Sequence, residues 1–348
     1  MKEPVRIAVV GAGLIGARHV EMIGRTRAVS LASIVDPSDA AAVLAEAEAV
    51  PHHPSLTEAI AAGGFDGVLL ATPNTLHVDG ALEAIRAGLP VLVEKPLASD
   101  AAGALEIVNA SEAAGVPVLV GHHRRHNPII QSARWLVDEG ALGRLTTVQA
   151  TTWFRKPDYY FDVAWRREAG GGPIQINLIH DIDLLQHFAG TIEEVHTFQS
   201  SAVRGFDVED AAVVTLRFAS GALGTINVSD ATAAPWSWEL TAGENSAYPA
   251  TNESAYLIGG TEASLALPNL SIWRHADENS WWAPISATRV PIDTDEPLVR
   301  QIEHFADIIR GDAAPLVSAR DGLVAVAAVE AVKRSGDTGQ TVRIADIC

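Results

Sequence analysis

The chain has 348 residues, 48% of them hydrophobic, which is enough for two domains of ordinary size, each with its own core. Its 25 Lys and Arg residues are outnumbered by 43 Asp and Glu residues, and the formal charge of -18 disfavours binding to nucleic acid or to an anionic membrane surface. The single cysteine, Cys348, excludes an intrachain disulfide framework, and the short apolar N-terminal run resembles neither a signal peptide nor a membrane span, so we predict a cytoplasmic protein.

From the N-terminus to about residue 121, short apolar runs alternate with segments of helical periodicity. The runs RIAVVGAG, VSLASIVD, DGVLLATP, PVLVEKP and PVLVGHH have the composition of buried strands, and the stretches between them have that of amphipathic helices. Continuous apolar strands separated by helices are typical of βαβ units and of a parallel sheet covered on both faces. We therefore predict an α/β domain with a doubly wound parallel sheet, a Rossmann domain, over residues 1–121.

A glycine motif follows the first predicted strand. The run VVGAGLIGARHV places Gly11, Gly13 and Gly16 in a GxGxxG pattern at the start of a helix, with Leu14 and Ile15 between them. The first glycine permits a tight turn, the second lets a pyrophosphate approach the backbone, and the third lets helix and strand pack closely. Unpaired N–H groups at the helix N-terminus favour phosphate. The segment therefore predicts a dinucleotide-binding loop.

A carboxylate follows at a distance that favours one dinucleotide over the other. Asp36 ends the second predicted strand, about 20 residues after the motif, where a carboxylate accepts hydrogen bonds from both hydroxyls of the adenosine ribose. The same carboxylate would repel a 2′-phosphate, and the next residue is Pro37, where a phosphate pocket would have arginine or serine. We predict NAD as the cofactor, with NADP less favoured.

The second half of the chain has a different pattern. A predicted helix from Ile129 to Glu139 precedes the Thr- and Val-rich run GRLTTVQATTWFR. Short strands are then predicted at AAVVTLRF, ALGTINVSD, SWELTAG, AYLIGG, ASLALP and LSIWRH, and consecutive strands favour an antiparallel sheet. Two helices, PLVRQIEHFADIIRG and ARDGLVAVAAVEAVKRSG, are each predicted to end at their final glycine. Residues 122–348 are thus predicted to form an α+β domain with a large, mostly antiparallel sheet.

In its motifs the chain resembles the family of glucose-fructose oxidoreductase, inositol dehydrogenase and MocA-type proteins. The resemblance rests on the order and spacing of GAGLIG, ATPNTLH (71–77), GLPVLVEKPLA (88–98), GHHRRHNP (121–128), AWRREAGGGP (164–173) and HDIDLL (180–185). It implies hydride transfer between nicotinamide C4 and a secondary hydroxyl or ketone of a sugar, polyol, cyclitol or sugar derivative. It also implies that the second domain binds the substrate and pairs through the open face of its sheet, so a homodimer or homotetramer is expected.

The resemblance assigns proton transfer to Lys95 of the EKP motif, beside the nicotinamide and before a cis bond to Pro96. Oxidising an alcohol requires a base within hydrogen-bond reach of its oxygen, and a buried amine next to a positive nicotinamide suits this task. His180 matches a histidine that assists proton transfer and substrate binding. The family's aspartate four residues earlier is replaced by Ile176, which weakens an inositol dehydrogenase assignment and leaves Asn177 as the candidate substrate anchor.

Further positions match family residues around the cofactor. Trp165 and Arg166 correspond to a Trp-Arg pair near the cofactor, although Arg166 could instead contact an anionic group of the substrate. Arg125 belongs to a short basic cluster suited to one small anion. The complete set of additional cofactor positions that the resemblance implies is Thr72, Pro73, Asn74, His77, Glu94, Arg125, Trp165 and Arg166.

Several alternatives remain open from the sequence. No metal site is predicted, because the histidines of GHHRRHNP and PHHP have no carboxylates at ligand spacing. Within enzymes, a cis-dihydrodiol dehydrogenase would suit an apolar site around Ile176, and NAD-assisted glycoside cleavage is a further option. A non-catalytic NAD-binding sensor of the same fold would be expected to lack Lys95 or His180, and both are present. The tryptophans at 236, 238, 273, 281 and 282 are expected in the core or at an oligomer contact.

Overall fold

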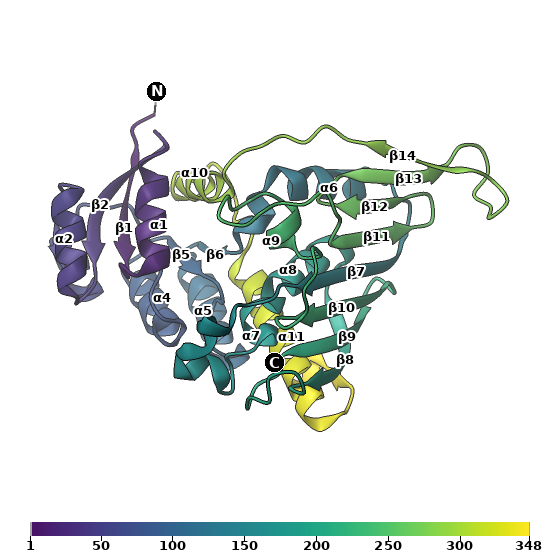
Figure 1. Cartoon of the computed structure of the whole chain (residues 1–348). Helices are drawn as coiled ribbons and strands as arrows, with labels where there is room; N and C mark the ends of the chain where they lie inside the picture. The colour runs from purple at the N-terminus through teal and green to yellow at the C-terminus, as the bar shows by residue number, and fades with distance from the viewer. Residues whose placement is uncertain (1, 348) are drawn as a thin grey trace. The chain divides into compact units, whose positions relative to one another are not determined.

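The computed structural model describes residues 2–347, so Cys348, on which the disulfide prediction rests, lies outside the described residues. Two compact units are formed (Figure 1). Unit 1 extends to His126 and also contains Glu296–Val326, and unit 2 contains Asn127–Asp295 and the chain from Ala327 onward. Segment 296–326 was predicted to lie in the second domain with the rest of residues 122–348, but its contacts assign it to unit 1.

A six-stranded parallel sheet forms the centre of unit 1, in the order β3-β2-β1-β4-β5-β6. Consecutive residues of β4, Val68, Leu69 and Leu70, are fully buried, so both faces of the sheet are covered, as the continuous apolar runs predicted. The strand order reverses between β1 and β4, the place where open α/β sheets bind ligands. The strands are β1 (Val5–Val10), β2 (Val29–Val35), β3 (His52–His53), β4 (Gly67–Leu70), β5 (Val91–Glu94) and β6 (Val118–Gly121).

The helices of unit 1 bury apolar side chains, and three of them begin at polar caps. The side chains of Ser38, Ser55 and Asp100 each accept a hydrogen bond from a free N–H group in the first turn of a helix. Ile302 and Phe305 are fully buried in the same core as the sheet, which explains why their helix belongs to unit 1. The helices are α1 (Leu14–Ile23), α2 (Asp39–Ala47), α3 (Leu56–Ala62), α4 (His77–Arg86), α5 (Ala101–Ala114) and α10 (Pro297–Ile309), with short turns η1 (Asn74–Leu76) and η2 (His123–His126).

Unit 2 contains a nine-stranded sheet in the order β14-β13-β12-β11-β7-β10-β9-β8-β15. All neighbouring pairs are antiparallel except β7 and β10, which are parallel. This confirms the predicted fold class of a parallel α/β sheet plus a mostly antiparallel one. The strands are β7 (Leu145–Trp153), β8 (Ile192–Ser200), β9 (Ala211–Phe218), β10 (Leu223–Ser229), β11 (Tyr256–Gly260), β12 (Ser264–Leu267), β13 (Ser271–His275), β14 (Ile285–Arg289) and β15 (Val342–Arg343).

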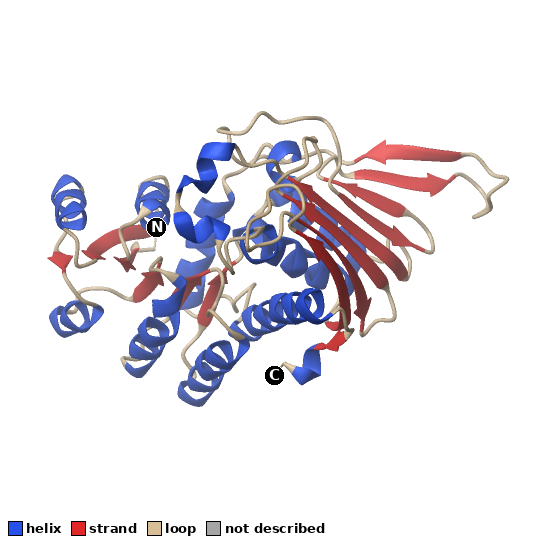
Figure 2. Cartoon of the chain, turned by 60° about the horizontal axis from the view of Figure 1, so that its bottom comes forward, coloured by secondary structure: helices blue, strands red, loops and turns tan. Residues whose placement is uncertain are grey.

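One face of this sheet is packed against helices (Figure 2). Along β9, Ala212, Val214 and Leu216 are buried, whereas Val213 and Thr215 between them are exposed, so only one face is covered. Helix α8 packs against β7, and α6 against β12. The helices that contribute to unit 2 are α6 (Pro128–Asp138), α7 (Pro173–Ile176), α8 (Leu178–Ala189), α9 (Trp238–Thr241) and the C-terminal part of α11 (Ala319–Thr338).

Two predicted elements were wrong. The segment SWELTAG forms helix α9 rather than a strand, because the Ser237 side chain accepts the Leu240 N–H and the Trp238 side chain is buried in the core. Helix α11 does not stop at Gly336 but continues to Thr338. Helix α11 packs closely on β8 at Gly336, since a Cβ there would lie 2.5 Å from Oε1 of Gln199.

The other four tryptophans that were expected in the core or at an oligomer contact differ from Trp238. Trp236, Trp273, Trp281 and Trp282 are all exposed, the last two most strongly.

Among the helices of residues 2–347, none is both long and apolar enough to cross a lipid bilayer.

Candidate active site

The glycine loop between β1 and α1 is shaped by close backbone contacts. Gly11 has φ +91°, and a Cβ there would lie 2.5 Å from the Ala71 carbonyl oxygen at the end of β4. A Cβ on Gly16 would lie 1.8 Å from the Gly11 oxygen. By contrast, a Cβ on Gly13 would meet no described atom within 4 Å, so this part of the loop is open. The loop therefore leaves room for a phosphate at the start of α1.

The first two residues of α1 are unusually exposed for apolar side chains. Leu14 is 87% exposed and Ile15 is 50% exposed. Both follow the open Gly13 directly, so they border the same space. Apolar side chains in this position are better suited to contact with a bound dinucleotide than to exposure to bulk water.

Asp36 is fixed beside this loop at the end of β2. The Ala12 N–H donates to Oδ2 at 2.9 Å, and the Ser38 N–H donates to Oδ1 at 2.9 Å. Partial burial works to raise the pKa of Asp36, but hydrogen bonds from Ser38 and Ala12 outweigh it and the pKa is lowered. The carboxylate is thus ionised at neutral pH, and each oxygen retains a lone pair for a further donor.

His77 links the loops that follow β4 and β5. Its ring is fully buried, with Nε2 at 3.0 Å from the Thr72 carbonyl oxygen and Nδ1 at 2.7 Å from the Pro96 carbonyl oxygen. The two loops are therefore held together by one side chain. Because both ring nitrogens contact main-chain oxygens, His77 supports the loop that carries Pro73 and Asn74 from within.

Lys95 directly follows β5 and is half-buried, with the cis bond to Pro96 that the resemblance implied. The preceding Glu94 is buried, its Oε1 lying 2.7 Å from Nε2 of His19 and its Oε2 accepting the Lys95 N–H at 3.1 Å. Burial works to raise the pKa of Glu94, but the His19 hydrogen bond and electrostatic interactions with His19, His123 and Lys95 lower it. His19 was not predicted from the sequence, because nothing in the pattern of α1 indicates a partner on β5.

The turn η2 places its basic side chains inside unit 1. The Arg125 guanidinium is almost fully buried, 3.3 Å from Asp321 Oδ1 and 3.5 Å from the Leu316 carbonyl oxygen. Burial and the electrostatic interaction with His304 lower the pKa of His126 to about 3, so this ring is neutral at physiological pH. Within residues 2–347, no three His, Cys, Asp or Glu side chains come close enough together to hold a metal ion.

In unit 2, Asn177 lies at the break between α7 and α8, and His180 lies in the first turn of α8. Among the described atoms, the buried Asn177 Oδ1 has no hydrogen-bond partner. His180 is buried, whereas Ile176 in α7 is half-buried. Asp181, next to His180, accepts hydrogen bonds from Thr152 Oγ1 at 2.7 Å and from the Tyr256 hydroxyl. This carboxylate anchors α8 to β7 and β11.

The loop between β7 and α7 holds the predicted Trp-Arg pair. The Arg166 guanidinium lies 4.1 Å from the centre of the Tyr160 ring, and its Nη1 donates to the Tyr160 carbonyl oxygen at 2.8 Å. Trp165 is half-exposed beside it, 5.5 Å from the guanidinium. A Cβ on Gly171 would lie 2.5 Å from the Trp165 carbonyl oxygen, which explains the need for glycine after this pair.

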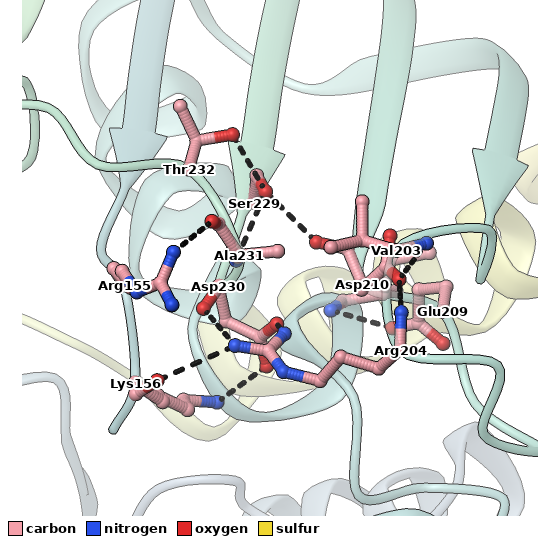
Figure 3. A network of polar contacts seen from close by, with 11 residues as sticks. Arg155, Lys156, Val203, Arg204, Glu209, Asp210, Ser229, Asp230, Ala231 and Thr232 are labelled. Atoms are coloured by element: carbon pink, nitrogen blue, oxygen red, sulfur yellow. Dashed lines mark hydrogen bonds and ion pairs between the residues drawn. The ribbon is translucent and has the colours of Figure 1, made fainter. Parts of the chain in front are cut away.

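A buried charge network supports this loop, and sequence reasoning missed it (Figure 3). Oδ2 of Asp230 lies 3.4 Å from Nζ of Lys156, and Oδ1 of Asp230 forms an ion pair with Arg204. Burial lowers the pKa of Lys156 and raises that of Asp230, in both cases against the attraction between them. Arg204 also donates to the Lys156 carbonyl oxygen at 3.3 Å. The network fixes the start of the loop to the end of β10.

The structure therefore gathers the predicted residues into a group in each unit. In unit 1, the glycine loop, Asp36, the loop after β4 and Lys95 all lie at the carboxyl ends of parallel strands. Arg125 differs, because its side chain is paired with Asp321 inside the unit. In unit 2, Trp165 and Arg166 share one loop, and Asn177 and His180 share the start of α8.

Comparisons with known proteins identify the family. The sequence model of an oxidoreductase family with an NAD-binding Rossmann fold matches residues 5–122, and that of the GFO/IDH/MocA C-terminal domain matches residues 130–266. Inositol 2-dehydrogenase of Corynebacterium glutamicum (strain R) is 30% identical over 237 residues, covering 66% of this chain and 68% of that protein. The chain belongs to the Gfo/Idh/MocA oxidoreductase family.

Other members are similar over more of their length. 1,5-Anhydro-D-fructose reductase of Ensifer adhaerens is 28% identical over 295 residues, which is 83% of each chain. The crystal structure of the WlbA dehydrogenase from Bordetella pertussis in complex with NADH and UDP-GlcNAcA matches with a TM-score of 0.77 and 27% identity, over 98% of each chain. Membership of the Gfo/Idh/MocA family confirms the predicted oxidoreductase class and the predicted cofactor, NAD.

Proposed function

We propose that this family member is an NAD-dependent dehydrogenase or reductase acting on a secondary hydroxyl or ketone of a sugar, polyol, cyclitol or sugar derivative. The position of Lys95 at the carboxyl end of β5 carries the proposal. Ligands of open α/β sheets bind outside the carboxyl ends of the strands, around the point where the strand order reverses. Asp36 lies on the β2 side of that point and Lys95 on the β5 side. We therefore assign the adenosine half to Asp36 and the nicotinamide half to Lys95.

The residues of unit 1 fit such a cofactor. The open side of Gly13 admits a phosphate, and the ionised Asp36 has lone pairs left for two ribose hydroxyls. Unit 1 is thus proposed as the NAD-binding domain and unit 2 as the substrate-binding and oligomerisation domain. The residues proposed to line the cofactor site are Gly11, Gly13, Leu14, Ile15, Gly16, Asp36, Thr72, Pro73, Asn74, His77, Glu94, Lys95, Arg125, Trp165 and Arg166.

Proton transfer is assigned to Lys95, with help from His180. A bound NAD+ would supply the hydride acceptor for the substrate carbon. The neutral Lys95 amine takes the hydroxyl proton during oxidation, and the ammonium returns it during reduction. His180 holds the same substrate oxygen or relays its proton. Asn177 anchors a second substrate hydroxyl, which is supported by its buried and unpartnered carboxamide oxygen among the described atoms.

The relatives support a carbohydrate-like substrate. Two are named for inositol and for 1,5-anhydro-D-fructose, and a third was crystallised with UDP-GlcNAcA. Ile176 offers no carboxylate where the family has an aspartate, so a different hydroxyl arrangement from that of inositol is proposed. The half-buried side chain of Ile176 also makes a cis-dihydrodiol worth including among the substrates tested.

The test is turnover with a substrate panel. Purified protein is mixed with NAD+ and inositols, polyols, aldoses, sugar acids, nucleotide sugars or cis-dihydrodiols, and reduced nicotinamide is followed by absorbance. We expect one class to react and Lys95→Met to lose roughly 100- to 10,000-fold in kcat. Lys333→Met removes an exposed lysine of α11 and serves as the matched control. NAD binding without turnover of any substrate, or full activity of Lys95→Met, would overturn the proposal.

We further propose that two or four copies associate through the open face of the nine-stranded sheet. Apolar side chains on four strands of this sheet remain exposed, which is unusual for a face that only contacts water. They are Phe198, Val213, Leu223 and Leu257. A second copy covering them would bury the apolar surface and remove it from water.

A further inference from the structure

Two neighbouring tryptophans lie at the tip of the hairpin that β13 and β14 form, in the loop 276–284. Trp281 is 87% exposed and Trp282 is 85% exposed, and their rings meet edge to face with centroids 5.4 Å apart. The hairpin runs past the ends of β11 and β12, so the tip projects from the sheet (Figure 1). Exposed aromatic surface of this kind is typical of protein contacts.

The tip is held in place by hydrogen bonds. Asn279 Nδ2 donates to Glu262 Oε2 at 3.0 Å and thereby ties the tip to the turn between β11 and β12. The Trp282 N–H donates to the Ser280 hydroxyl oxygen at 3.3 Å. An ordered turn therefore presents the two indoles, and their edge-to-face arrangement forms a ridge that fits into a hollow, not one flat stacking platform.

A hollow of about 400 Å³ lies at the opposite edge of the same sheet. Its lining includes Glu194 of β8, Arg217 of β9 and Arg343 of β15, and the register places both arginines opposite the glutamate. Glu194 and the exposed Phe198 are four positions apart on β8, whereas Val195 between them is buried. The hollow therefore borders the open face of the sheet.

The tip and the hollow lie at the same end of the strands. The strand pairings show that β9, β13 and β15 all end where β8 begins. In the strand order, however, β14 and β13 form one edge, and β8 and β15 form the other. A twofold axis parallel to the strands reverses the strand order of a second copy and keeps the same ends together. The tip of each copy then faces the hollow of the other.

We propose that the β13–β14 hairpin is a clasp that places Trp281 and Trp282 in the hollow of a second copy of this chain. The proposal rests on the association through the open sheet face that is proposed above. Each contact of a twofold dimer occurs twice, so one tip and one hollow per copy complete the pair.

The area and the chemistry of the two parts fit this occupant. Two indoles bury about 300–500 Å² in full contact, which is a large share of the about 800 Å² per partner that a stable interface needs. The Arg217 and Arg343 side chains are 58% and 70% exposed, so their guanidinium groups are accessible to the faces of indole rings. Tryptophan and arginine are also the residues that most often dominate the free energy of an interface.

The test uses two complementary variants and measures association alone. The double variant Trp281→Ser/Trp282→Ser removes both indoles, and Ala345→Glu fills the hollow with a longer side chain. Each variant keeps the part that the other lacks, so a mixed dimer regains one of its two contacts. Trp135→Ser on α6, where the side chain is 58% exposed, and Ala113→Glu at an exposed position of α5 are the matched controls. Sedimentation velocity over a concentration series gives the Kd of each variant and of their equimolar mixture.

We expect the dimer Kd to rise roughly 30-fold for each contact that is lost. It should therefore rise roughly 1,000-fold in each variant alone and only roughly 30-fold in the mixture. Both controls should keep the wild-type Kd. All substituted positions are exposed, so circular dichroism should be unchanged. If Ala345→Glu does not fold, Arg343→Ser takes its place as the hollow variant.

A wild-type Kd in the tip variant would overturn the proposal and assign the tryptophans to another occupant. A mixture that associates no more tightly than its two components would also overturn it, because tip and hollow would then not meet. Phe198→Asp separates this inference from the sheet-face proposal. Dissociation by Phe198→Asp, with wild-type association of both clasp variants, refutes the clasp alone, whereas a wild-type chain that stays monomeric at every concentration refutes both.

Discussion

Replacement of Asp36 by asparagine tests how the carboxylate selects the dinucleotide. The two oxygens of Asp36 accept one main-chain N–H each, from Ala12 and Ser38, at 2.9 Å. Asparagine keeps one acceptor oxygen, while its NH2 group faces one of these N–H donors and cannot accept from it. The substitution therefore removes the charge and also disturbs the geometry that holds the side chain in place.

The expected magnitude follows from the hydrogen bonds at stake. A hydrogen bond to a charged group contributes about 1.5–3 kcal/mol, and at least one such bond to the ribose is lost in Asp36→Asn. We expect NAD+ affinity to fall roughly 30- to 150-fold, corresponding to about 2–3 kcal/mol. NADP+ affinity should fall less or rise, because repulsion of its 2′-phosphate is relieved.

Isothermal titration calorimetry with both dinucleotides provides the measurement. Asp39→Asn removes an exposed carboxylate at the start of α2 and should leave both affinities unchanged. The pKa of Asp36 in the folded protein is lowered below its ordinary value of 3.8. Its contribution to folding stability is therefore fully present above pH 3.8 and is lost as the pH falls through the lowered pKa. An NAD+ affinity within twofold of wild type in Asp36→Asn would refute the assignment of the adenosine ribose.

Three further changes test unit 2. Asp230→Asn leaves the buried Lys156 without its counterion and should lower the free energy of unfolding, measured by urea denaturation, by about 3–5 kcal/mol. Adding Lys156→Met should recover part of this loss. No recovery in the double variant would mean that the two residues are not coupled. Gly172→Ala places a Cβ 2.2 Å from Oε1 of Glu209 and should lower the free energy of unfolding by about 1–3 kcal/mol in the same assay. An unaltered denaturation midpoint would show that the Glu209 carboxylate moves freely. Phe198→Asp should dissociate the proposed oligomer in sedimentation velocity, whereas Val203→Asp, equally exposed but in a loop, should not. Equal sedimentation of the two variants would exclude the sheet face as the interface.

The architecture of unit 1 and its cofactor loop could be predicted because local sequence determines them. Apolar β-branched runs indicate strands covered on both faces, and the close approaches at Gly11 and Gly16 leave no space for a side chain. Asp36 is the first charged position after its run, and Lys95 directly follows the charged Glu94 that ends its run, which places both at the carboxyl edge of the sheet. Patterns of this kind span a few residues and need no knowledge of tertiary contacts.

The other features depend on contacts between distant segments. His19 and Glu94 are 75 positions apart, and neither helix nor strand periodicity indicates that they pair. The amphipathic stripe of α10 predicts that one face is buried, but it does not show which core receives it. The WEL run alternates like a strand, yet the cap from Ser237 and the burial of Trp238 favour a helical turn. These outcomes are decided by packing, which periodicity alone does not encode.

A crystal structure with NAD+ and a reacting substrate would test the central claim most directly. We expect the Lys95 Nζ within about 3 Å of the reacting oxygen, and the adenosine ribose on the Asp36 carboxylate. An amine directed away from the nicotinamide, with the reacting carbon held against other groups, would contradict the assignment of Lys95 and the dehydrogenase mechanism built on it.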